Sequence, residues 1–137
     1  MSSTDPGATT LFVCVTCRMQ SAEPASSEQP RAGARLLEAI HAVAAEHRDV
    51  TVVPVECLSN CSRACTVAVT APGKWTYIVG ALDPDVHADD VLAFARLHQV
   101  HEAGLPPWRE RPEYVRKNTI ARVPPLPSRS SKEASLP

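Results

Sequence analysis

The sequence predicts an α/β fold in which two helices cover a small mixed sheet. Short apolar runs rich in β-branched residues alternate with two stretches whose apolar residues recur every three or four positions. In chain order they predict a strand, a helix, a strand, a loop, two strands and a helix. The chain has 137 residues, 44% of them hydrophobic, which suits one domain with one core.

The first half is predicted to form a strand, a helix and a second strand. Residues 9–13 form a short β-type run, and the Ser-, Ala- and Pro-rich residues 18–30 predict a loop. Helical spacing of apolar residues predicts an amphipathic helix over residues 31–47. Residues 50–56 form a continuous run rich in β-branched residues, which predicts a buried central strand. Pro54 within this run indicates a strand end or a bulge.

The second half is predicted to form a hairpin and a helix. Residues 66–71 and 75–79 flank Pro-Gly-Lys, a turn sequence. Asp83 and Pro84 suit the cap and first position of the second helix, and Gly104 suits its end. The predicted apolar face of this helix contains Val86, Val91, Leu92, Ala95, Leu97 and Val100.

Composition divides the chain into four parts. Residues 1–8 predict a disordered N-terminus and residues 9–103 the folded domain. Residues 104–137 hold seven of the 13 prolines and carry seven Lys and Arg against three Asp and Glu. We expect a Pro/Arg-rich, extended and partly docked arm over residues 104–127, then a disordered tail over residues 128–137.

The overall charge argues against two classes of partner. The formal net charge is −1, so neither a nucleic acid nor a membrane surface would bind through bulk charge. No apolar run approaches the ~18 residues of a membrane span, and residues 1–9 show no visible signal-peptide pattern. We therefore expect a cytoplasmic protein, in which clustered cysteines bind metal or do redox chemistry more often than they form disulfides.

All five cysteines lie in two groups, each after a predicted strand. Cys14 and Cys17 form a Cys-x-x-Cys pair, and Cys57, Cys61 and Cys65 follow at four-residue steps. Loops at strand ends bring thiolates together and leave backbone N–H groups free to bond to sulfur, as iron–sulfur clusters require. Five cysteines confined to two loops are better explained by a metal centre than by packing as small hydrophobic residues.

Residues 55–64 (Val-Glu-Cys-Leu-Ser-Asn-Cys-Ser-Arg-Ala) and the Val-Ala-Val that follows resemble the thioredoxin-like [2Fe-2S] ferredoxins. The resemblance spans residues 11–98. It implies a thioredoxin-like fold, electron transfer to redox partner proteins, pairing as a homodimer, and a [2Fe-2S] cluster. Its ligands would be Cys14, Cys17, Cys57 and Cys61. The sequence departs from the pattern in three places. Cys65 replaces a proline and is an alternative ligand. Ser59 replaces a glycine, and the first cysteine pair is more closely spaced.

The C-terminal part carries a second resemblance. Residues 107–113 (Pro-Trp-Arg-Glu-Arg-Pro-Glu) and 121–125 (Ala-Arg-Val-Pro-Pro) resemble a family of small bacterial proteins predicted to bind metal, DUF1636. Genes of that family often lie beside genes for cobalamin synthesis and cobalt handling. The resemblance implies an electron-donor or metal-handling role in corrinoid synthesis.

Two other functions remain open. Four of the cysteines suit a closed zinc site in a metal-handling protein without redox function. A thiol–disulfide oxidoreductase would need a helix immediately after Cys17, where the sequence predicts a loop. We assign the histidines to solvated helix faces and helix ends, namely His41, His47, His87, His98 and His101. No catalytic motif is visible, so we expect an electron carrier or metal-binding protein and not an enzyme.

Overall fold

The computed structural model describes residues 8–16, 31–45, 50–59 and 64–126. Five strands form one sheet in the order β2-β1-β3-β4-β5. Strands β1 and β2 are parallel, whereas β1 with β3, β3 with β4 and β4 with β5 are antiparallel. The strands are β1 (Thr9–Cys14), β2 (Val50–Val55), β3 (Val67–Thr70), β4 (Thr76–Val79) and β5 (Thr119–Val123). The predicted α/β class with a mixed sheet is confirmed.

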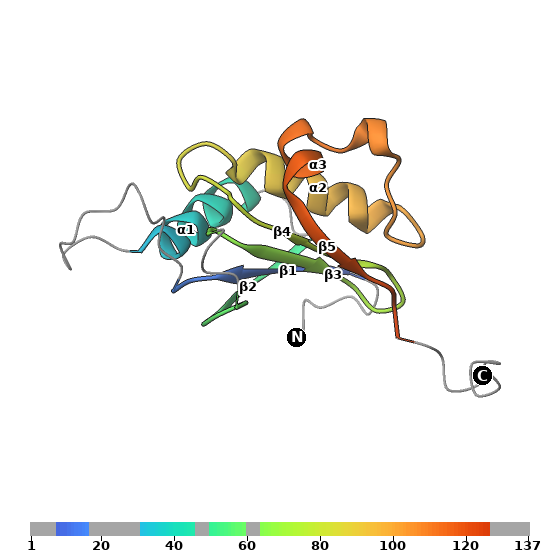
Figure 1. The fold of residues 1–137 in the computed structure, drawn as a ribbon, viewed down its shortest axis with the longest axis horizontal. Helices are drawn as coiled ribbons and strands as arrows, with labels where there is room; N and C mark the ends of the chain where they lie inside the picture. The colour runs from blue at the N-terminus through green and yellow to red at the C-terminus, as the bar shows by residue number, and fades with distance from the viewer. Residues whose placement is uncertain (1–7, 17–30, 46–49, 60–63, 127–137) are drawn as a thin grey trace.

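Two helices, α1 (Ala32–Ala44) and α2 (Ala88–Val100), lie on one face of the sheet (Figure 1). The core forms between them and the sheet, because alternate residues of the strands point to this face. Its fully buried members include Leu11, Val13, Leu36, Ile40, Tyr77 and Phe94. No helix in the described ranges is long and apolar enough to cross a membrane.

Strand β2 lies at the edge of the sheet and not at its centre. Its only partner among the described strands is β1, which it pairs from Thr9 opposite Val50 to Cys14 opposite Val55. Pro54 has no N–H to donate, and an edge strand tolerates it because one side of the ladder is unpaired. The prediction of a central strand was therefore wrong, and Pro54 was the better indicator.

Helix α2 begins at Ala88, four residues after the predicted start. The Asp83 carboxylate accepts the Asp85 N–H at 2.8 Å, so it stabilises a turn before the helix and does not cap the helix itself. The predicted apolar face is wrong at its two ends, since Val86 is 63% and Val100 72% exposed.

The C-terminal segment is not an extended arm. It forms the 3₁₀-helix η2 (Trp108–Glu110), helix α3 (Glu113–Asn118) and strand β5, which completes the sheet beside β4. The exposed edge of β4 offers unpaired backbone groups, and the Thr-Ile-Ala-Arg-Val sequence of β5 suits a strand. Val115 of α3 is buried in the core. The predicted disordered ends, residues 1–8 and 128–137, lie almost entirely outside the described residues.

Candidate metal centre

Cys14 and Cys57 come from the same end of two neighbouring strands. Cys14 is the last residue of β1, and Cys57 follows the last residue of β2 by two positions. Because β1 and β2 are parallel and in register, their carboxyl ends meet at one end of the sheet. The structure thus brings together one cysteine from each sequence group. Cys14 is buried and Cys57 is exposed.

Contacts beyond the strands keep these two segments side by side. The N–H of Val15 donates to the carbonyl of Val55 at 2.9 Å, and the Thr16 hydroxyl donates to the carbonyl of Glu56. The Cys14 thiol lies 3.7 Å from that same Glu56 carbonyl, one residue before Cys57. The Cys14 thiol is therefore in contact with the backbone of the residue immediately before Cys57.

A backbone donor already faces one sulfur atom. The N–H of Ser59 lies 3.2 Å from the Sγ atom of Cys57. Ser59 has a φ of 58°, a left-handed conformation that glycine adopts without steric cost. This conformation explains why glycine suits the position in the family that the sequence resembles. An N–H···S hydrogen bond stabilises a thiolate, whether it is free or bound to metal.

Cys65 lies on the other side of Cys14, two residues before β3 begins. Its backbone N–H and C=O each form a 3.1 Å hydrogen bond with Leu82. The next residue, Thr66, accepts the N–H of Cys14 at 3.1 Å. This hydrogen bond places a third cysteine near the end of β1. Cys65 is fully buried.

The first turn of α1 packs directly against Cys14. A Cβ atom added to Gly33 would lie 2.0 Å from the Cys14 carbonyl oxygen, so only glycine permits this approach. Arg31, just before the helix, donates to the Thr16 carbonyl at 3.1 Å. The helix N-terminus and the guanidinium group both bring positive charge to this loop. The sequence predicted the start of this helix but not its contact with Cys14, because the two lie apart in the chain. A glycine within the predicted helix was the available signal.

The remaining predicted ligands, Cys17 and Cys61, lie outside the described residues. Within the described ranges, no group of three or more Cys, His, Asp or Glu side chains could hold a metal ion. The complete ligand set therefore stays a prediction. The two described candidates nevertheless fit a thiolate-bound group, since they adjoin each other and one has an N–H donor at its sulfur.

His98 is a core residue, and its assignment to a solvated helix end was wrong. It is fully buried, with Nε2 2.7 Å from the Trp75 carbonyl and Nδ1 2.8 Å from the Thr9 hydroxyl. Burial lowers the pKa of His98, and the hydrogen bond to Trp75 opposes this effect only in part. The neutral ring donates from Nε2 and accepts at Nδ1. The burial of His98 could have been predicted from its spacing, because it follows Val91 by seven residues and lies on the same buried face of the helix.

The chain matches a family model described as "Protein of unknown function (DUF1636)" over residues 11–125. The chain belongs to this family. The match covers both cysteine groups and the C-terminal segment through β5, so the resemblance in the C-terminal sequence is confirmed. A comparison with curated proteins finds no match.

The fold of this DUF1636 protein is similar to solved structures of a thioredoxin-like [2Fe-2S] ferredoxin from Aquifex aeolicus. One has a TM-score of 0.54 and 18% sequence identity, covering 87% of this chain and 96% of that chain. A second structure, of the wild type, has a TM-score of 0.51 and 20% sequence identity, and the match covers 84% of this chain and 98% of that chain. At such identities the likeness establishes a thioredoxin-like fold, as predicted, and leaves the cofactor to be argued from the residues.

Proposed function

We propose that this DUF1636 protein transfers single electrons through a [2Fe-2S] cluster. One observation carries the proposal: Cys14 and Cys57 meet at the carboxyl ends of parallel strands, and a backbone N–H bonds to the Cys57 sulfur. Support comes from the fold, since the ferredoxins it resembles are titled as [2Fe-2S] proteins. The proposed ligands are the four cysteines of the sequence prediction, Cys14, Cys17, Cys57 and Cys61.

The described residues would stabilise and tune such a group. The cluster, when bound, supplies a one-electron couple whose potential depends on hydrogen bonds, local charge and solvent exposure. The Ser59 N–H offsets negative charge at the Cys57 sulfur. The N-terminus of α1 and Arg31 place positive charge beside the Cys14 loop, which favours the reduced and more negative state.

Exposure of Cys57 suits exchange of electrons with another protein. Its side chain is exposed, whereas Cys14 is buried beneath α1. A cluster held between them would lie near the surface on one side and against the domain on the other. We therefore propose redox partner proteins, and no substrate of the chain's own. Pairing as a homodimer and service to cobalamin or cobalt metabolism stay predictions from the sequence resemblances.

The first experiment is to purify the protein without air, record its visible spectrum, and assay iron and acid-labile sulfide. We expect broad visible absorption that bleaches on reduction, with about two irons and two sulfides per chain. A colourless protein that contains zinc would replace the proposal with a metal-handling protein. A metal-free protein with a reducible Cys14–Cys17 disulfide would replace it with a dithiol oxidoreductase, for which α1 supplies the nearby helix N-terminus.

Variants then test the ligand assignment. Cys57→Ser and Cys61→Ser should each lose most of the iron and sulfide, because each removes one of four thiolates. Cys65→Ser is the matched control, since it removes a buried thiol from the same end of the sheet and should keep the cluster. Full cluster content in Cys57→Ser or Cys61→Ser would contradict the assignment. Loss in Cys65→Ser would show that Cys65 is a ligand.

A further inference from the structure

A cavity of about 470 Å³ lies between strands β4 and β5 and the segment from η2 to α3. Its wall includes Tyr77, Trp108, Arg111, Arg116 and Arg122. None of these residues belongs to the cysteine-bearing segments. In Figure 1, α1, whose first turn contacts Cys14, lies to the left and η2 lies to the upper right. The proposed metal centre therefore does not account for this cavity.

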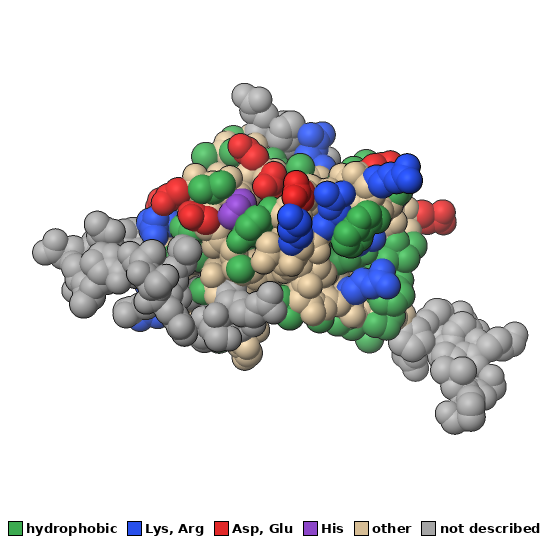
Figure 2. Space-filling model, turned by 45° about the horizontal axis from the view of Figure 1, so that its top comes forward, with side chains coloured by type: hydrophobic (Ala, Val, Ile, Leu, Met, Phe, Trp, Pro, Cys, Tyr) green, Lys and Arg blue, Asp and Glu red, His purple; other side chains and the backbone are tan. Residues whose placement is uncertain are grey.

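Three arginines give the cavity its charge. Arg111 and Arg116 come from the segment above the sheet, and Arg122 comes from β5. No acidic side chain lines the cavity, and in the described part of the chain none of the three arginines forms an ion pair. The nearby carboxylate of Glu113 pairs with Lys117 at 2.8 Å, and its pKa is lowered by that hydrogen bond and by the charges of Lys117 and Arg116. Figure 2 shows Lys and Arg side chains gathered beside hydrophobic side chains on the same face.

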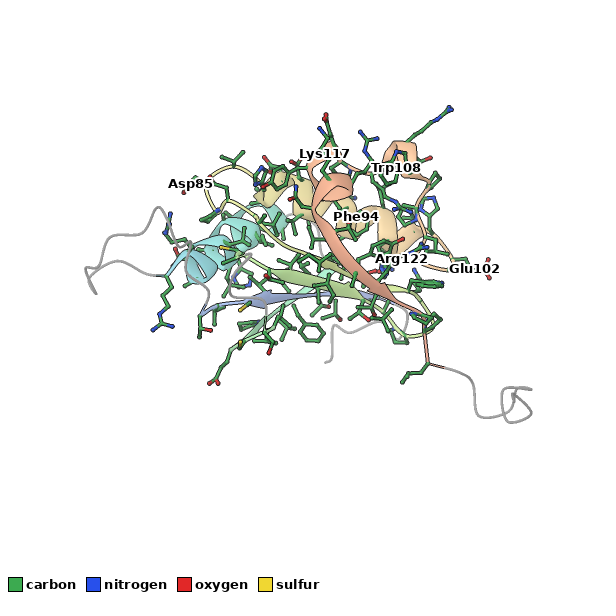
Figure 3. All side chains as sticks on the ribbon, in the orientation of Figure 1. Asp85, Phe94, Glu102, Trp108, Lys117 and Arg122 are labelled. Carbon is green, nitrogen blue, oxygen red and sulfur yellow. The ribbon has the colours of Figure 1, made fainter. Side chains whose placement is uncertain are left out.

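Aromatic rings hold these guanidinium groups without neutralising them. Arg111 lies 5.3 Å from the centre of the Tyr77 ring and 5.8 Å from that of Trp108. Arg116 lies 5.5 Å from the Trp108 ring, and Arg122 lies 4.9 Å from the Trp75 ring. Such cation–π contacts orient a guanidinium group and leave its charge available to an anion. In Figure 3, Trp108 lies on the segment above the sheet and Arg122 lies on β5.

Arg111 is fixed in a way that favours ligand binding. Its Nε atom donates to the Pro106 carbonyl at 2.9 Å. This hydrogen bond uses one of five N–H donors and leaves the two terminal nitrogens for a bidentate contact. Little side-chain freedom would then be lost when an anion binds, because the side chain is already held.

Tyr77 contributes a rigid ring to the cavity wall. Tyr77 is fully buried, and its Oη atom has no partner among the described residues. Its ring is held edge-on against Phe94, with the ring centres 5.0 Å apart. Because the Oη atom exposes no surface, the ring of Tyr77 and not its hydroxyl supports Arg111 beside the cavity.

We propose that this cavity binds a phosphate group, either free phosphate or the phosphate of a small organic ester. Three guanidinium groups supply the charge and the forked donors that a phosphate dianion requires. The cavity volume falls in the range of small-molecule sites, which favours a small ligand over a flat protein surface.

Isothermal titration calorimetry of the purified full-length protein tests the proposal at constant ionic strength. The probes are inorganic phosphate, pyrophosphate and adenosine monophosphate, with oligoglutamate as an acidic peptide for comparison. We expect at least one probe to bind in the millimolar range or more tightly. Equal binding of phosphate and the monophosphate would identify free phosphate as the ligand class, and tighter binding of the monophosphate would identify an ester. No measurable binding by any probe would overturn the proposal. Binding of oligoglutamate alone would also overturn it, in favour of an acidic protein partner.

Variants locate the binding. Arg116→Gln and Arg122→Gln should each weaken binding about tenfold, the loss of one charge-assisted hydrogen bond. Arg109→Gln is the matched control, because Arg109 is exposed beside Trp108 and does not line the cavity. Tyr77→Phe should leave binding unchanged, because the Tyr77 hydroxyl exposes no surface to the cavity. Equal affinities in the wild type, Arg116→Gln and Arg122→Gln would contradict the site.

Discussion

Replacement of Gly33 by alanine tests the contact between α1 and the end of β1. The added Cβ would lie 2.0 Å from the Cys14 carbonyl oxygen and 3.0 Å from the carbonyl carbons of Cys14 and Val15. Side-chain carbons rarely approach other heavy atoms closer than about 3 Å, so the helix and the strand end would have to separate by about 1 Å. The atoms that the Cβ would meet all belong to the backbone, so no flexible side chain can move aside.

Two opposing effects set the magnitude. In a helix, alanine is favoured over glycine by about 1 kcal/mol, which alone would stabilise the variant. Overpacking in a close-packed interior costs about 1–3 kcal/mol, and a backbone clash lies at the upper end of that range. We therefore expect Gly33→Ala to lower the free energy of unfolding by about 2 kcal/mol. Because this separation would displace Cys14, a proposed ligand, Gly33→Ala should also lower the metal content of the protein.

Urea unfolding of the metal-free protein and an iron assay of the purified protein together check this prediction. Gly73→Ala is the control, since Gly73 has nothing within 4 Å of an added Cβ and a φ of +73°. It should lose about 1 kcal/mol through backbone strain alone and keep its metal. A Gly33→Ala protein as stable as the wild type would refute the close approach. Lower stability with full metal content would refute the link between this contact and the metal centre.

Two further predictions concern the far end of α2. Burial lowers the pKa of His98 in the folded protein. Below about pH 6.5 the unfolded state therefore binds a proton at His98 more readily than the folded state does, and the free energy of unfolding should fall as pH falls. His98→Gln should reduce this pH dependence in urea titrations at about pH 7.5 and about pH 5.5, and identical slopes in the two proteins would contradict the assignment. Lys74 donates to the carbonyls of His98 and Gln99, at 3.1 and 2.6 Å. Lys74→Met should therefore cost about 1–2 kcal/mol, and an unchanged melting temperature would argue against this capping role.

Local patterns in the sequence predicted most of the elements. The β-branched runs, the helical spacing of Leu36 and Ile40, and the Pro-Gly-Lys turn all correspond to observed strands, a buried helix face and a hairpin. These signals depend on neighbours within a few residues, so they do not require knowledge of the tertiary fold. The convergence of Cys14 and Cys57 followed from the same logic, because both lie at strand ends, Cys14 as the last residue of β1 and Cys57 two residues after β2.

Features that depend on tertiary contacts were not predicted. Strand β5 is short and follows many prolines, and it is a strand because β4 presents an open edge to it. His98 is polar, and its burial requires Thr9 and the Trp75 carbonyl, which come from distant parts of the chain. The position of α1 against Cys14 requires the whole β1–α1–β2 arrangement.

The C-terminal segment supports the cysteine end of the sheet through consecutive hydrogen bonds. The Tyr114 hydroxyl donates to the carbonyl of Ala81. The residue after Ala81, Leu82, forms two backbone hydrogen bonds of 3.1 Å with Cys65. The residue after Cys65 accepts the N–H of Cys14 at 3.1 Å. The family match spans the cysteines and this segment together, as expected if they form one unit. A chain ending after α2 would therefore leave the edge of β4 unpaired, remove three arginines from the cavity, and withdraw support from the turn that holds Cys65.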